Sequence, residues 1–79
     1  MPVYFFDRSE DGEFSRGDYP IECASVDEAR REAVRALAEI AKEEFPNGDR
    51  RQIAIQIRED GGPPILSASL SLRVETESG

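Results

Sequence analysis

The sequence contains no histidine and a single cysteine, Cys23. Histidine is the commonest acid–base catalyst and a frequent zinc ligand, so its absence argues against both kinds of site. One cysteine cannot form a disulfide within the chain, and without a neighbouring base it is a poor nucleophile. We therefore expect Cys23 to be a small buried hydrophobe.

Basic residues and long apolar runs are also scarce. The chain has 10 basic and 17 acidic residues, a net charge of −7, and it lacks the basic stripe that neutralises phosphates. No segment approaches the length of a membrane span. The short apolar run before Asp7 has neither the basic region nor the cleavage-like site of a signal peptide. We expect a cytoplasmic protein that binds neither nucleic acid nor membrane.

The chain length allows only one small domain. A chain of 79 residues buries about 60 to 65% of its unfolded surface, so its core is thin. One helix on one sheet is about what such a core supports. We expect a single α+β domain over residues 1–75 and a frayed polar tail over residues 76–79.

Residues 25–45 form the longest periodic segment, and their period is that of an amphipathic helix. Ser25 is suited to the N-cap, and Glu28 completes a capping box. Pro46 ends the helix and favours an extended backbone at Phe45. The apolar stripe consists of Val26, Ala29, Ala33, Val34, Ala36, Leu37, Ile40, Ala41 and Phe45. Because this stripe is rich in alanine, we expect the helix to lie close against a sheet.

The remaining periodic segments indicate strands. Residues 3–7 are apolar at both parities, which is typical of a central strand, and Asp11-Gly12 predicts a hairpin turn into a short return strand at 13–16. Residues 53–58 and 65–75 alternate between apolar and polar side chains on either side of a Gly-Gly-Pro-Pro turn. The sequence therefore predicts the order β-β-α-β-β, with one helix on one face of a mostly antiparallel sheet of three or four strands.

The sheet face away from the helix is the main candidate for function. If the isoleucines of 53–58 face the helix, the other face carries short or uncharged side chains, where a solvated face usually carries charges. Tyr4 and Phe6 would add an aromatic pair if they share that side; alternatively, residues 17–23 cover them. The candidate interaction residues are Tyr4, Phe6, Ala54, Gln56, Ser67, Ser69 and Ser71. We expect this face to dock a protein, most simply a second copy.

Arg30 interrupts the apolar stripe of the helix. The simpler interpretation is that its stem lies on the edge of the core while its charge reaches water or a carboxylate such as Asp7. The alternative is a specific contact with a ligand or partner. Arg30 is therefore a further candidate interaction residue.

Residues 7–18 partly match a calcium-binding loop. Asp7, Ser9, Asp11 and Asp18 fall at loop positions 1, 3, 5 and 12, and Gly12 falls at position 6. However, the flanks are not helical, position 12 is the shorter Asp, and a hairpin needs Asp-Gly there in any case. Beyond this loop the sequence suggests no cofactor. It also carries no P-loop, no Gly-x-Ser-x-Gly motif and no base for a serine nucleophile, so we expect no enzyme.

Four segments carry a resemblance to a known family. They are Met-Pro-Val-Tyr-Phe-Phe-Asp at 1–7, Asp-Glu-Ala-Arg at 27–30, Pro-Asn-Gly-Asp-Arg-Arg at 46–51 and Leu-Ser-Leu-Arg-Val-Glu at 70–75. With them the chain resembles a family of short alphaproteobacterial proteins of unknown function that open with Met-Pro-x-Tyr-Phe-Phe-Asp. The resemblance implies a cytoplasmic ββαββ protein and no particular activity. Members have a shorter polar stretch than residues 8–12, which counts against a calcium loop.

Three hypotheses about function remain open. The first is a non-catalytic protein-interaction module that uses the outer sheet face, with a homodimer as one form of the interaction. The second is a protein that binds a small ligand or calcium through residues 7–18 and Arg30. The third is an antitoxin-like partner of a toxin, which rests on the order of the elements alone.

Overall fold

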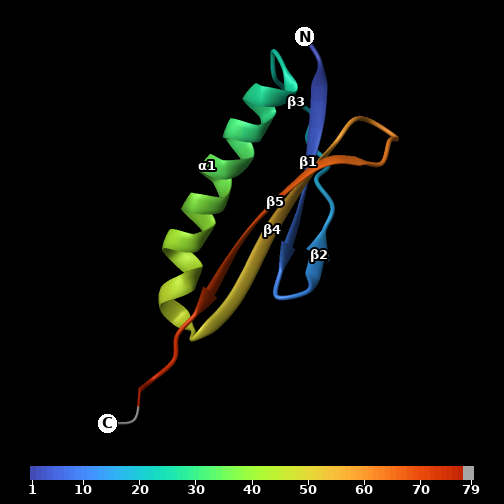
Figure 1. Ribbon diagram of the computed structural model, residues 1–79. Helices are drawn as coiled ribbons and strands as arrows, with labels where there is room; N and C mark the ends of the chain where they lie inside the picture. The colour runs from blue at the N-terminus through green and yellow to red at the C-terminus, as the bar shows by residue number, and fades with distance from the viewer. Residues whose placement is uncertain (78–79) are drawn as a thin grey trace.

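The computed structural model describes residues 1–77. Within them one long helix lies along one face of a five-stranded sheet (Figure 1), so the predicted α+β class is confirmed. The elements are β1 Val3–Glu10, β2 Glu13–Ser15, β3 Ile21–Glu22, α1 Val26–Glu44, the 3-10 turn η1 Phe45–Asn47, β4 Arg50–Arg58 and β5 Pro64–Arg73. The sequence did not predict β3, which is only two residues long.

Every strand pair of the sheet is antiparallel, and the order is β2-β1-β4-β5 with β3 also paired to β1. β1 is therefore an interior strand, as its two apolar parities predicted. The residues that flank β1 show how its backbone groups alternate in direction: the N–H of Asp11 bonds to the β4 side, whereas the C=O of Pro2 accepts from Cys23 after β3. The backbone groups of even-numbered residues in β1 point away from β4. β2 and β3 both pair with this edge of β1, each at a different end, and a gap remains between them.

The turn between β1 and β2 has the geometry that Asp-Gly predicted. Asp11 has φ 51° and Gly12 has φ 89°, and a two-residue hairpin turn of this kind needs positive φ at both positions. The turn sets the register, in which Glu10 faces Glu13 and Ser9 faces Phe14.

The N-cap of α1 is Ser25 as predicted, but Glu28 bonds to the residue before the N-cap and not to Ser25, as a capping box would require. Ser25 Oγ accepts the N–H of Glu28 at 3.2 Å, and the Glu28 carboxylate accepts the N–H of Ala24 at 2.5 Å. The end differs, because Phe45 stays helical (φ −64°, ψ −35°) and bonds to the carbonyl of Ala41. Pro46 then lies in the first turn of η1, where a missing N–H removes no hydrogen bond. The expectation of an extended Phe45 was wrong.

The core lies between α1 and the inner face of the sheet, which is the face that α1 covers. Its buried members are Tyr4, Cys23, Ala29, Ala33, Leu37, Ile53, Ile55 and Ile57. Ala29 and Ala33 are completely buried, and their small side chains let α1 lie close to β4 and β5. Val26 and Val34 of the predicted stripe remain largely exposed, so the buried part of the stripe is narrower than predicted.

Beyond β5 the chain leaves the sheet. Thr76 and Glu77 belong to no strand or helix. The predicted tail at 76–79 includes residues 78 and 79, which lie outside the described residues. No helix within residues 1–77 combines the length and the apolar composition that crossing a membrane requires.

Candidate interaction surface

The outer face is the side of the sheet opposite α1. Gln52, Ala54 and Gln56 of β4 point to it because Ile53, Ile55 and Ile57 point to the core, and the register then places their neighbours on β5. The cross-strand pairs are Gln52–Ser71, Ala54–Ser69 and Gln56–Ser67. The structure therefore brings the predicted residues Ala54, Gln56, Ser67, Ser69 and Ser71 together on this face.

Tyr4 and Phe6 do not lie on the outer face. Phe6 pairs with Ile57 across β1 and β4 and packs against the core, and Tyr4 is 3% exposed within the core. The expectation that they flank the serines was wrong. Because β1 is apolar at both parities, its sequence alone does not say which set faces the helix; the register with β4 decides this.

The aromatic side chains on the outer side come from other positions. Phe5 lies opposite Arg58 of β4, and Phe14 lies opposite Ser9 of β1. Phe14 is 62% exposed. Phe14 was not among the predicted interaction residues, although the two-residue turn at Asp11-Gly12 was a signal: it fixes the Ser9–Phe14 pair and hence the face of Phe14.

A shallow hollow of about 190 Å³ opens beside this aromatic ring. Its lining is Asp7, Arg8, Ser9, Phe14, Ala54 and Gln56. Small-molecule pockets have volumes of about 300–1,000 Å³ and enclose most of their ligand. This hollow is smaller, so it fits a side chain of a docked protein better than a small ligand.

One end of the outer face carries a buried ion pair between Asp7 and Arg58. Arg58 Nε donates to Asp7 Oδ2 at 2.8 Å, and the two side chains are only 5% and 8% exposed. Gly17 completes the cluster: its N–H donates to Asp7 Oδ1 at 2.8 Å, and its carbonyl accepts from Arg58 Nη2 at 3.0 Å. The Arg58 guanidinium also lies 4.8 Å from the centre of the Phe5 ring. Both charges are therefore fully engaged within the fold.

The Asp7 carboxyl experiences opposing effects. Burial raises its pKa, but the hydrogen bond from Arg58, the hydrogen bond from Gly17 and the positive charge of Arg58 together lower it below the ordinary value. The carboxylate is therefore ionised at neutral pH, and Arg58 balances its charge.

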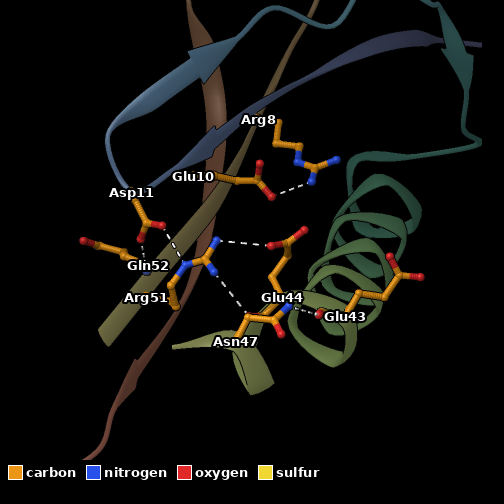
Figure 2. Close-up of polar contacts among 8 residues, drawn as sticks. All are labelled: Arg8, Glu10, Asp11, Glu43, Glu44, Asn47, Arg51 and Gln52. Atoms are coloured by element: carbon orange, nitrogen blue, oxygen red, sulfur yellow. Dashed lines mark hydrogen bonds and ion pairs between the residues drawn. The ribbon is translucent and has the colours of Figure 1, made fainter. Parts of the chain in front are cut away.

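A second arginine cluster lies on the inner side, where the β1–β2 turn meets the end of α1 (Figure 2). Arg51 Nε donates to Asp11 Oδ2 at 2.7 Å, and its terminal nitrogens reach the carbonyl and the carboxylate of Glu44 at 3.2 and 3.3 Å. The Asp11 carboxylate also accepts the N–H of Gln52 at 2.9 Å. That bond, followed by those from Arg51, lowers the pKa of Asp11 despite partial desolvation.

The structure does not assemble the predicted calcium loop. Asp7 and Ser9 lie in an extended strand, Asp11 occupies the turn, and Asp18 is exposed beyond β2. The carboxylates of Asp7 and Asp11 already accept hydrogen bonds from arginines and backbone N–H groups. Within residues 1–77 no group of three or more potential ligands is arranged to hold a metal ion.

Arg30 is exposed on α1. Its suggested partner Asp7 lies on the opposite face of the sheet and bonds to Arg58, so that pairing was wrong. Whether Arg30 contacts a partner stays a prediction.

Cys23 is buried at 1% exposure. Burial raises the pKa of its thiol, and the negative charges of Glu28 and Glu32 raise it further. The thiolate is therefore disfavoured, and the side chain acts as part of the core, as the sequence predicted.

A comparison with models of protein families gives a match. Residues 3–71 match the model of a family described as Domain of unknown function (DUF6894). Neither the comparison with curated proteins nor the comparison with solved structures gives a match.

Proposed function

Because the chain belongs to the DUF6894 family, whose description assigns no activity, we propose a function from its own surface: a non-catalytic protein-interaction module that binds through the outer face. The observation that carries the proposal is the central strip of this face, where Ala54 and Gln56 of β4 lie beside the serines of β5. A third of the residues in the chain are charged, yet this strip has no charged side chain. Covering an uncharged strip with a protein costs less desolvation free energy than covering charged side chains.

The borders of the strip support the same function. Phe14 offers an exposed ring beside the hollow, and exposed aromatic residues are enriched at protein interfaces. At one end, Asp7 and Arg58 neutralise each other. A docking protein therefore meets an aromatic anchor and a flat polar strip, without an unpaired buried charge to desolvate.

The proposal includes the finer expectations from the sequence. The module acts in the bacterial cytoplasm, without a cofactor and without binding nucleic acid or membrane, consistent with its net charge of −7. Self-association is one form of the interaction. An antitoxin-like pairing with a toxin is a special case, and only the likeness in the order of elements favours it.

The test replaces Ala54, at the centre of the strip, with lysine. The control is Glu39→Lys, which introduces the same side chain on the exposed side of α1 and raises the net charge by two units, one more than Ala54→Lys. Both purified variants are checked for folding by circular dichroism and then used, beside the wild type, to capture proteins from the native cytosol. We expect Ala54→Lys to lose partners that the wild type and Glu39→Lys retain. Equal capture by all three folded proteins would overturn the proposal.

A further inference from the structure

The two edges of the sheet are built differently. On the β1 side, β2 and β3 cover only short stretches, of three and two residues, and the chain between them contains Gly17 and Pro20. On the other side, β5 is a ten-residue strand at the end of the sheet. Among residues 1–77, none pairs with its outward edge.

The hydrogen-bonding groups on the free edge of β5 can be assigned. Val74 N–H bonds to the carbonyl of Asp49 on the β4 side at 2.7 Å, so the even-numbered residues of β5 direct their backbone groups toward β4. The odd-numbered residues Ser67, Ser69 and Ser71 direct theirs outward. A strand that exposes such a row of donors and acceptors is a template for another strand, unless charges, prolines or bulges protect it.

Such protection is confined to the ends of β5. Pro64 begins the strand, and a register irregularity lies near Ile57 and Arg58. Between these features and Arg73, the segment 65–72 carries no charge and no proline. We infer that this edge pairs antiparallel with β5 of a second copy, about a two-fold axis at Ser69. This inference concerns the edge and stands separately from binding at the outer face.

The segment around Ser69 is complementary to itself in the antiparallel direction. With Ser69 opposite its own copy, Ser67 lies opposite Ser71 of the second copy, and all these serines present outward backbone groups. On the inner face the same register places Ala68 opposite Leu70, and Leu66 opposite Leu72. Leu70 is 40% exposed in the single chain. A second copy therefore satisfies the edge and extends the apolar inner face across the axis.

Charge also favours a second copy. Two chains of net charge −7 repel each other over most of their surfaces, but 65–72 is neutral. The antiparallel arrangement brings Arg73 of each copy to the start of the other β5, next to the turn that holds Glu59 and Asp60. Arg73 lies opposite Arg50 in its own sheet and pairs with Glu75 at 2.7 Å. Two further carboxylates near the two arginines of each copy add opposite charges to a pair of like charges.

The first test measures association by sedimentation equilibrium on the full chain, over a wide concentration range. We expect dimers. Ser69→Pro removes the outward N–H at the axis without removing a bond to β4, and it should weaken dimerisation by about 10- to 100-fold. Ser69→Ala keeps that N–H and should dimerise like the wild type. A wild type that stays monomeric at every concentration would overturn the inference. The same conclusion would follow if the free edge bound a strand of another protein but never a second copy.

A second test checks the register and does not depend on the proline variant folding. In the inferred pair the two copies of position 69 lie about 5.5 Å apart between Cα atoms, whereas the two copies of position 71 lie roughly 14 Å apart. A short thiol-to-thiol reagent such as dibromobimane should therefore cross-link Ser69→Cys but not Ser71→Cys. The wild type controls for the buried Cys23. Equal cross-linking at both positions contradicts the register. Partner capture by Ala54→Lys reports on the outer face, and cross-linking of Ser69→Cys reports on the edge of β5. If the first is lost while the second is intact, the edge inference stands independently of the outer face.

Discussion

The two arginine clusters use the same chemistry in different surroundings. Arg58 and Asp7 are 8% and 5% exposed, whereas Arg51 and Asp11 are 20% and 44% exposed. Each pair joins the region around the first hairpin to β4, and each carboxylate also accepts a backbone N–H. The buried pair is a structural element whose halves depend on each other, while water can replace much of the exposed one.

The largest effect should follow from Arg58→Met, which keeps much of the side-chain volume but leaves Asp7 buried without its cation. Breaking a buried pair on one side costs about 3–5 kcal/mol, and here the carbonyl of Gly17 also loses its donor. We expect a loss of this size in the free energy of unfolding, measured by urea denaturation. The double variant Asp7→Leu with Arg58→Met should be more stable than Arg58→Met alone. A double variant less stable than the single one would contradict a coupled pair.

Gly17→Ala should perturb the same cluster without removing a charge. A Cβ at this position would lie 2.1 Å from the carbonyl oxygen of Phe6, so the loop must move away from β1. Crowding of this kind costs about 1–3 kcal/mol, and the displaced loop should weaken the bonds to Asp7 and Arg58. Thermal unfolding measures the loss. Gly12→Asn, at a position with open space and positive φ, is the control and should be tolerated better.

The two clusters should also differ in how much they contribute to the pH dependence of stability in acid. The pKa of Asp7 is lowered in the folded protein, so its contribution to stability is present above the unfolded pKa of about 4 and is lost as the pH falls through the lower folded value. The pKa of Asp11 is also lowered, and its contribution has the same sign. Because the Asp7 pair is better shielded from water, Asp7→Asn should remove more of the acid dependence than Asp11→Asn. Urea denaturation between about pH 6 and pH 2 measures both. Identical acid profiles for the two variants would be inconsistent with this difference.

The smallest effect is expected for Arg51→Met. Its partners Asp11 and Glu44 reach water and are screened by salt. We expect a loss of stability smaller than that of Arg58→Met, and one that shrinks as the salt concentration rises. Melting temperatures of both variants and the wild type, in low and high salt, measure the difference. A loss as large as that of Arg58→Met, unchanged by salt, would show that the exposed cluster is structurally equivalent to the buried one.

Much of the candidate surface could be predicted because its strands alternate cleanly. Once the isoleucines of β4 are assigned to the core, Ala54, Gln56 and the serines of β5 must face outward. Residues in β1 gave no such constraint. From the sequence alone Tyr4 and Phe5 are equally plausible core residues, and the prediction placed Tyr4 and Phe6 on the outer face although they face the core. The Asp7–Arg58 pair was not predicted, because its two residues are far apart in sequence and meet only when β1 pairs with β4.

The sequence by itself determined the features that local chemistry controls. These are the helix start at Ser25, the Asp11-Gly12 turn and the alternation in β4 and β5, because capping, positive φ and period-two burial each act within a few residues. Only the tertiary structure decided the face of Tyr4 and Phe6, the partner of Asp7 and the free edge of β5. Each of these depends on which strands are neighbours and in what register, and that choice is made by the packing of the whole sheet against α1.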